Sequence, residues 1–217
     1  MLKKILIPAI LAEDAKQLQN QIYQVDELVE YIQIDFMDGE FIKEKSHFSA
    51  KDFYLINPVA KTELHMMVNS PEKYLDEWIK AGIEKFIVHA EAKIDWNGLF
   101  DIYNDNFIKL YIAINPDTPI NRIEDKIQII DGITIMSVDP GKARQNFLPK
   151  VLGKIKTLRN RYPKLNIQID GGMHLAPINT INQAILAGAN EIVCGSEIFL
   201  STDIPKKIEQ LYQGIGQ

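Results

Sequence analysis

Short hydrophobic runs alternate with longer amphipathic runs along the whole chain. The short runs are rich in β-branched residues, which is typical of buried strands. We predict eight strands, at residues 4–8, 31–35, 62–66, 85–89, 108–114, 132–137, 166–170 and 191–195. The longer runs have the period of helices, for example at residues 14–28, 71–81, 145–162 and 176–187. This alternation predicts an α/β fold with a parallel sheet, and eight strands favour a (β/α)8 TIM barrel over a doubly wound sheet.

Several predicted helices carry signals for their ends. Ser70-Pro71-Glu72 predicts an N-cap, a first-turn proline and a favourable acid. Gly82 and Gly188 lie where a helix must end before the next strand, which predicts left-handed residues there. No low-complexity linker or break in composition divides the chain, so we expect one barrel domain over residues 1–217.

Composition and charge exclude several classes of function. The 217 residues are 46% hydrophobic and 24% charged, as in an ordinary globular protein. The net charge of −5 argues against a nucleic-acid partner, because no basic excess neutralises phosphates. No run approaches the length of a membrane span, and the apolar run at residues 5–8 is too short for a signal peptide. The single cysteine, Cys194, lies in an apolar strand, which predicts a buried thiol and a cytoplasmic protein.

Acidic and histidine side chains end three of the predicted strands: Asp35, His65 and Asp170. The carboxyl ends of barrel strands meet at one mouth, where two carboxylates and an imidazole can hold a divalent metal and move protons. Across that mouth, Asp35 and Asp170 can act as base and acid on opposite faces of one carbon. Epimerisation beside a carbonyl requires this arrangement, together with a cation or donors for the enediolate. A single acid would only indicate a helix cap.

Glycine-rich turns follow the last strands. Gly171 and Gly172 follow the seventh strand, and Gly195 and Ser196 follow the eighth. Loops at these two positions, with a short helix N-terminus, form the usual phosphate site of such barrels. Gly141, after the sixth strand, adds a third turn. Each turn alone is explained by chain reversal, but three in one sector predict a phosphate site.

Two further groups at strand ends have open roles. Met37, Met67 and Met136 either line an apolar lid over the reacting carbon or fill gaps in the core. His89 and Glu91 end the fourth strand and either have no part in the site or orient a ligand from behind it.

These motifs resemble, in order and spacing, those of the ribulose-phosphate 3-epimerases. The similar segments are residues 7–12, 34–39, 64–67, 88–92, 115–119, 138–145, 170–172 and 195–199. The resemblance implies a barrel isomerase of carbohydrate metabolism and the pentose phosphate pathway, which interconverts pentulose 5-phosphates through a metal-stabilised enediolate. It also implies self-association and a Zn2+, Mn2+ or Fe2+ ion.

The resemblance assigns roles to individual residues. Asp35 and Asp170 match the two proton-transfer residues, which also ligate the metal, and His65 matches a metal-binding histidine. The positions that match phosphate-binding residues are Gly171, Gly172, Gly195 and Ser196.

The chain departs from the family pattern at four places. Gln33 stands where the family has a second metal-binding histidine, and its amide oxygen would be a far weaker ligand. Ala9 replaces a serine whose hydroxyl contacts the substrate. The glycine-rich lid reads Lys142-Ala143-Arg144, whose cations either clamp phosphate or are solvated. The acid before His65 is changed to Glu63.

We therefore predict an epimerase that converts D-ribulose 5-phosphate to D-xylulose 5-phosphate, with a metal that is weakly bound. Two alternatives remain: a non-catalytic sugar-phosphate-binding paralogue, favoured by Gln33 and Ala9, and an epimerase of a related ketose phosphate such as allulose 6-phosphate. A Schiff-base aldolase is disfavoured because no predicted strand ends in lysine.

Overall fold

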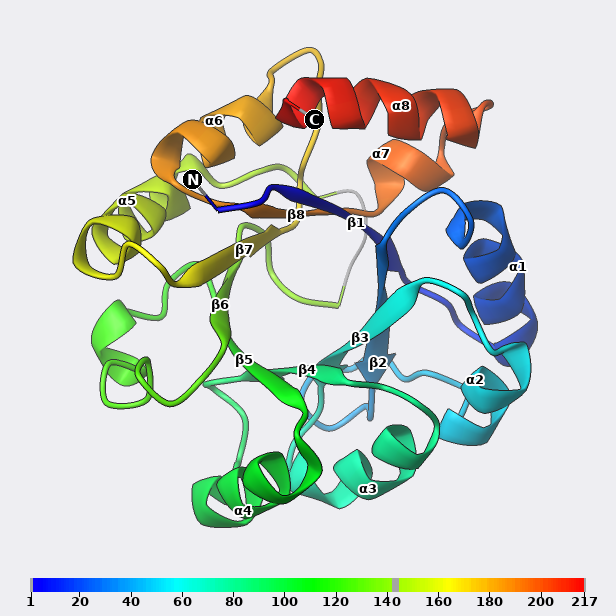
Figure 1. Ribbon diagram of the computed structural model, residues 1–217, viewed down its shortest axis with the longest axis vertical. Coiled ribbons are helices and arrows are strands. Elements are labelled where there is room, and N and C mark those ends of the chain that lie inside the picture. Colours follow the sequence, from blue (N-terminus) through cyan, green and yellow to red (C-terminus); the bar gives the residue numbers. More distant parts are fainter. Residues whose placement is uncertain (1, 142–144, 217) are drawn as a thin grey trace.

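Eight parallel strands close into a barrel in this computed structural model, which describes residues 2–141 and 145–216 (Figure 1). The strands are β1 (Ile5–Ile10), β2 (Tyr31–Met37), β3 (Lys61–Met67), β4 (Lys85–His89), β5 (Lys109–Ile114), β6 (Gly132–Met136), β7 (Asn166–Asp170) and β8 (Glu191–Cys194). Each strand pairs with the next, and β8 pairs with β1. The predicted TIM barrel is confirmed, and every strand begins within one residue of its predicted start.

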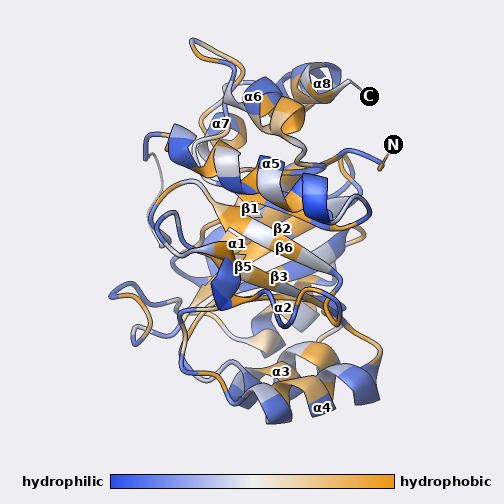
Figure 2. Ribbon diagram, turned by 90° about the vertical axis from the view of Figure 1, so that its left-hand side faces the viewer, coloured by the Kyte–Doolittle hydropathy of each residue, from blue (hydrophilic) through white to orange (hydrophobic). Residues whose placement is uncertain are grey.

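The helices form an outer ring around the strands (Figure 1). They are α1 (Ala15–Val25), α2 (Ala50–Ile56), α3 (Glu72–Lys80), α4 (Trp96–Asn106), α5 (Leu152–Arg161), α6 (Thr180–Ala187), α7 (Ser196–Phe199) and α8 (Ile204–Ile215). Two short 3-10 helices, η1 (Ile120–Arg122) and η2 (Pro149–Val151), lie in the connections around β6. Hydrophobic residues concentrate in the strands and on the helix faces that pack on them (Figure 2).

Alternate residues of each buried strand face the helices and the barrel interior. In β3, Leu64 and Met66 belong to the main hydrophobic core, whereas His65 and Met67 line the pocket at the barrel mouth. Aromatic packing anchors α3, because the Trp78 ring is fully buried and its centroid lies 5.2 Å from that of Phe36. This alternation directs every second strand residue into the barrel, and those near the carboxyl ends of the strands face the site.

A layer of charged and polar side chains fills the barrel interior. We call Glu63, Lys85, Tyr111, Gln168 and Glu191 the charged layer. The Lys85 Nζ lies 2.7 Å from a carboxylate oxygen of both Glu63 and Glu191, and 3.8 Å from the Tyr111 ring centroid. The Gln168 amide donates to Glu63 Oε1 at 2.7 Å. Because Glu63 and Gln168 each lie two residues before a strand-end residue of the site, this layer is directly beneath it.

Two predicted helix starts are wrong. The helix predicted from Gln145 begins only at Leu152, after η2, because Pro149 lacks a backbone N–H and suits a first turn. The helix predicted from residue 176 begins at Thr180, because the side chain of Asn179 accepts from Asn182 N and caps it there.

The predicted cap of the third helix is also wrong, whereas the glycine signals are confirmed. Ser70 has a φ of +55°, and its hydroxyl donates to Lys93 O instead of accepting from the helix, so Pro71 takes the N-cap position. Gly82 and Gly188 follow their helices with φ of +99° and +117°. Cys194 is buried as predicted, and burial raises the pKa of its thiol.

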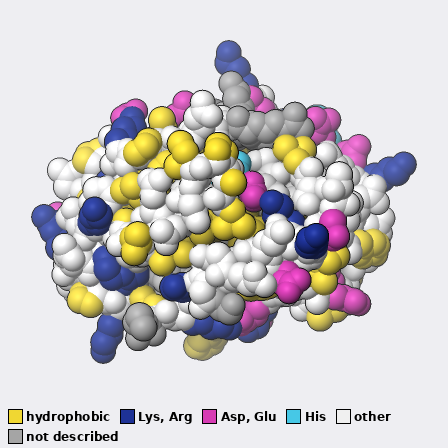
Figure 3. All heavy atoms as spheres, turned by 90° about the horizontal axis from the view of Figure 1, so that it is seen from above, with side chains coloured by type: hydrophobic (Ala, Val, Ile, Leu, Met, Phe, Trp, Pro, Cys, Tyr) yellow, Lys and Arg dark blue, Asp and Glu magenta, His cyan; other side chains and the backbone are white. Residues whose placement is uncertain are grey.

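The two ends of the chain lie on the same side of the molecule (Figures 1 and 2). The Lys4 Nζ donates to Ile215 O at 2.7 Å and ties β1 to the end of α8. Toward α6, α7 and α8, hydrophobic side chains form small groups separated by polar and charged atoms (Figure 3). Among the helices within residues 2–141 and 145–216, none has the length and apolar character needed to cross a membrane.

Candidate active site at the barrel mouth

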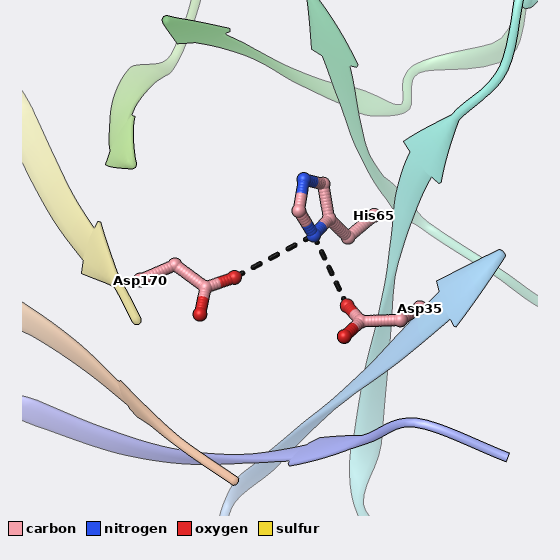
Figure 4. A group of neighbouring side chains, drawn as sticks. All are labelled: Asp35, His65 and Asp170. Atoms are coloured by element: carbon pink, nitrogen blue, oxygen red, sulfur yellow. Dashed lines mark hydrogen bonds and ion pairs between the residues drawn. The ribbon is translucent and has the colours of Figure 1, made fainter. Parts of the chain in front are cut away.

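Three strand ends bring Asp35, His65 and Asp170 together (Figure 4). The register of β2 and β3 places Asp35 beside His65, and Asp170 reaches them from β7. The His65 Nδ1 lies 3.0 Å from Asp35 Oδ1 and 3.5 Å from Asp170 Oδ2. One ligand atom from each residue lies within 4.8 Å of the others. The three side chains selected from the sequence thus form one cluster.

The carboxamide of Gln33 lies among these three side chains. Its Nε2 donates to Asp35 Oδ1 at 2.8 Å and to Asp170 Oδ2 at 2.9 Å, and lies 3.4 Å from His65 Nδ1. Carboxylate oxygens only accept, so the amide presents its NH2 group to them. From the sequence we expected the Gln33 amide oxygen to face a metal, but here its NH2 group faces the two aspartates. Its Oε1 is buried and has no partner among the described residues.

A buried histidine and a carboxylate support His65 from behind. The Nε2 atoms of His65 and His89 are 2.8 Å apart, and His89 Nδ1 lies 3.5 Å from Glu91 Oε2. Burial lowers the pKa of His89 to about 4, so this ring is neutral and its Nε2 accepts from His65. Burial acts to raise the pKa of Glu91, but hydrogen bonds from His89, Thr118 and the backbone of Asn115 lower it to about 2. This chain of contacts leaves His65 Nδ1 directed at the aspartates.

The environment of Asp170 suits a group that carries a proton near neutral pH. Burial and, after it, the charge of Asp35 raise the pKa of Asp170 to about 6, against the opposing effects of His65 and Gln33. Burial acts to lower the pKa of His65, but the hydrogen bond and charge of Asp35 outweigh it and the pKa is raised. Two carboxyls in such different environments can serve as an acid and base pair.

A pocket of about 680 Å³ opens above the cluster, a size suited to a small ligand. The predicted binding residues line it: Met37, Met67, Met136, Gly141, Gly171, Gly172, Gly195 and Ser196. Ala9 lines it too, where the family pattern has serine. Of the four departures from that pattern, the segment Lys142-Ala143-Arg144 lies outside the described residues.

One group of pocket residues was not selected from the sequence. Glu13, Gln17 and Gln21 line the pocket from the start of α1 and the loop before it. These residues are four positions apart, which is the spacing of one helix face. This row of polar residues is the feature of the sequence from which their place in the pocket could have been predicted.

Two glycines of the predicted phosphate site leave no room for a side chain. Gly171 has a φ of +106°, and a Cβ there would lie 2.4 Å from Val138 Cγ2. Gly172 has a φ of +62°, and its Cβ would lie 2.8 Å from the backbone nitrogen of Phe147. At the wall of the pocket, Gly171 therefore packs against the Val138 side chain and Gly172 against the Phe147 backbone, and the positive φ at both positions favours glycine.

The residues present fit a divalent metal at three ligands. Two carboxylates and an imidazole suit Mn2+, Fe2+ or Zn2+. The Gln33 amide lies beside these three ligands, and its hydrogens face the same carboxylate oxygens that a metal would use. The fit is therefore good for Asp35, His65 and Asp170 and poor for Gln33.

Known sequences similar to this chain belong to one family. A profile of the ribulose-phosphate 3-epimerase family matches residues 5–199. A ribulose-phosphate 3-epimerase of Candida glabrata is 34% identical over 224 residues, covering 94% of this chain and 89% of that protein. A ribulose-phosphate 3-epimerase of Synechocystis sp. is 36% identical, with 92% and 89% covered. The one of Bacillus subtilis is 31% identical, with 94% and 96% covered.

Solved structures share the fold at low sequence identity. A 3-hexulose-6-phosphate synthase of Salmonella typhimurium has a TM-score of 0.72 at 12% identity, covering 98% of both chains. KGPDC from Streptococcus mutans has a TM-score of 0.74 at 11% identity, covering 99% of this chain and 98% of that one. These similarities concern the barrel alone.

Proposed function

Because this chain belongs to the ribulose-phosphate 3-epimerase family, we propose that it is an isomerase that inverts C3 of D-ribulose 5-phosphate to give D-xylulose 5-phosphate. The observation that carries the proposal is the pair Asp35 and Asp170, which approach one buried centre from different strands at the floor of a ligand-sized pocket.

The two carboxyls divide the proton transfers. Asp35 takes the C3 proton from one face of the sugar, and the electron pair of the broken C–H bond moves to the C2 carbonyl to give an enediolate. Asp170 returns a proton to the other face of C3, and its raised pKa suits that acid role. The reverse reaction exchanges the two roles.

Asp35, His65 and Asp170 are the residues that would hold a divalent metal. Such an ion supplies positive charge next to the enediolate oxygens. Two carboxylate ligands beside one imidazole favour a hard ion such as Mn2+ or Fe2+, although Zn2+ accepts the same set. The Nε2 contact with His89 leaves His65 Nδ1 as the ring nitrogen that would bind such an ion.

The substrate phosphate is expected at the glycine turns after β7 and β8, where the backbone can approach its oxygens. We predict that Gly172→Ala raises KM for the sugar phosphate by about tenfold or more, with a smaller change in kcat, because the new methyl displaces the Phe147 backbone. Steady-state kinetics would measure this.

Gly82→Ala is the matched control for that variant. Gly82 also has positive φ, but its Cβ would meet no atom within 4 Å, and it precedes β4 at the end of the barrel opposite the mouth. Both variants carry backbone strain of about 1–2 kcal/mol, and only Gly172→Ala adds the contact with Phe147. Equal KM values in the two variants would remove Gly172 from the phosphate site.

Proton NMR of D-ribulose 5-phosphate in D2O tests the function directly. We expect loss of the C3 proton signal with growth of D-xylulose 5-phosphate, in protein assayed with Mn2+ or Zn2+ and without added metal. A substrate that binds, shown by calorimetry, yet keeps its C3 proton under every condition would contradict the proposal.

That outcome would favour the second candidate, a sugar-phosphate-binding paralogue without catalysis. Ala9 supports this candidate, because the pocket lacks the hydroxyl of the family pattern at the end of β1. The same assay with D-allulose 6-phosphate distinguishes a pentulose from a hexulose enzyme.

We further propose a homo-oligomer in the cytoplasm. The reduced, buried thiol of Cys194 supports a reducing compartment, and a rice relative 30% identical to this chain is named a cytoplasmic isoform.

A further inference from the structure

The Gln33 carboxamide lies close to the atoms of Asp35, His65 and Asp170 that could hold a metal. Metal–oxygen and metal–nitrogen bonds to such ligands are about 2.0–2.2 Å long. An ion bonded to Asp35, His65 and Asp170 would therefore lie among their three ligand atoms. The Gln33 Nε2 lies in that region, at 2.8, 3.4 and 2.9 Å from the same three atoms.

The amide and an ion exclude each other. Both N–H bonds of Gln33 use the carboxylate oxygens that would bind the metal, so an ion can enter only if the carboxamide turns away. Gln33 is fully buried, and its position on β2 is fixed by pairing with Ala9 of β1 and Glu63 of β3. Turning the amide breaks two charge-assisted hydrogen bonds, of which the one to Asp170 is buried and the one to Asp35 is partly buried, and this lowers the affinity for the ion.

The same hydrogen bonds position the carboxyls as a metal would otherwise do. Two neighbouring carboxyls repel each other when both are ionised. The bridging NH2 group holds them at one separation, and it adds no charge that must be balanced when an ion is absent. Gln33 lies two residues before Asp35 on the same face of β2, so the strand itself aims the amide at the pair.

We propose that Gln33 replaces the resident metal: its carboxamide bridges Asp35 and Asp170 and keeps the proton-transfer pair in working geometry without a tightly bound ion. Gln33 is a positioning residue in this role. When Asp35 takes the substrate proton, it becomes a weaker acceptor, and one Gln33 N–H is released as negative charge develops on the substrate oxygen. This inference rests on the proposed epimerase function.

Chelator-treated protein, with its metal content measured, provides the test. The assay is C3 proton exchange of D-ribulose 5-phosphate for the natural protein, Gln33→His and Gln33→Leu, each with and without Mn2+ or Zn2+. We expect the stripped natural protein to keep its rate within about threefold of the metal-supplied value. Stripped Gln33→His should lose about 100-fold and recover with metal, and stripped Gln33→Leu should lose a similar amount, since neither keeps the bridging NH2.

Metal affinity gives a readout that does not depend on activity. Competition with a chelating dye should show that Gln33→His binds Mn2+ or Zn2+ at least about tenfold more tightly than the natural protein. Gln19→His, which adds a histidine at an exposed position of α1 outside the pocket lining, should leave the affinity unchanged.

Two results would overturn the inference: a natural protein that loses about 100-fold in rate when stripped and regains it with metal, or one that binds the ion as tightly as Gln33→His. Absence of exchange in the natural protein under all conditions would instead refute the epimerase function. The affinity comparison would still decide the role of Gln33 in that case, even if Gln33→Leu failed to fold.

Discussion

Asp170→Asn should lower the rate of C3 proton exchange by about 10³-fold or more and leave the barrel folded. General acid–base transfer by one positioned group contributes about 10²–10⁴-fold, and an asparagine neither takes nor gives the proton. The shape of the side chain is kept, and its amide oxygen still accepts from Gln33. Exchange followed by NMR, with calorimetric binding of the sugar phosphate as a second measurement, separates lost chemistry from lost binding.

Asp139→Asn is the matched control for that variant. Asp139 is an exposed acid that also lines the pocket but lies outside the Asp35, His65 and Asp170 cluster. The rate of C3 proton exchange by Asp139→Asn should stay within a few fold of that of the natural protein. Exchange at a natural rate in Asp170→Asn would exclude Asp170 from the proton transfers.

The difference in stability between the natural protein and Asp170→Asn should depend on pH in a defined direction. The folded state raises the pKa of Asp170 from 3.8 to about 6, so it binds that proton more tightly than the unfolded chain. The stabilising contribution is full below the unfolded pKa and is lost as the pH rises through about 6. In chelator, the natural protein should therefore lose stability relative to the variant between about pH 4 and pH 7, measured by thermal melts.

Lys85→Met should destabilise the barrel by about 3–5 kcal/mol, because it breaks a buried ion pair. Lys85 is the cation of the charged layer, and its removal leaves the carboxylates of Glu63 and Glu191 buried without their ion-pair partner. The pKa of Glu63 is already raised by burial, and the nearby Lys85 charge opposes that rise. Urea unfolding at pH 7 would measure the change.

Lys80→Met tests whether burial is the cause. Lys80 pairs with Asp76 at 2.7 Å, the same distance as in the charged layer, but both side chains are more than 70% exposed. Exposed pairs contribute about 0–1 kcal/mol, so this variant should unfold almost as the natural protein does. Similar losses in the two variants would show that the charged layer does not depend on Lys85.

The barrel was predictable because each strand is a short apolar run with clear limits, as Lys85–His89 and Asn166–Asp170 illustrate. The predicted starts of two helices were wrong because single residues, Pro149 and Asn179, set where those helices begin. Helical periodicity extends through such residues, whereas a missing N–H or a side-chain cap sets the actual first turn.

The candidate site was predictable as far as strand ends determine it. Asp35, His65 and Asp170 each end a strand or lie close to its end, and closure of the barrel is enough to bring them together. The charged layer was not predictable, because Glu63, Lys85 and Glu191 are single charges in apolar strands. Only the closed barrel brings Lys85 of β4 to Glu63 of the neighbouring β3 and to Glu191 of β8. The direction of the Gln33 amide was not predictable either, since only its partners in the folded protein select NH2 over oxygen.

In the proposed mechanism, each turnover leaves the two carboxyls in the protonation state opposite to the one that began it. After ribulose 5-phosphate is converted, the proton lies on Asp35 and Asp170 is ionised, which is the form ready for the reverse reaction. The free enzyme must then reset before it can repeat the forward one. His65 Nδ1 lies within 3.5 Å of both carboxyls and offers a short route for that return. By this route the proton can return to Asp170 without leaving the site before the next forward turnover.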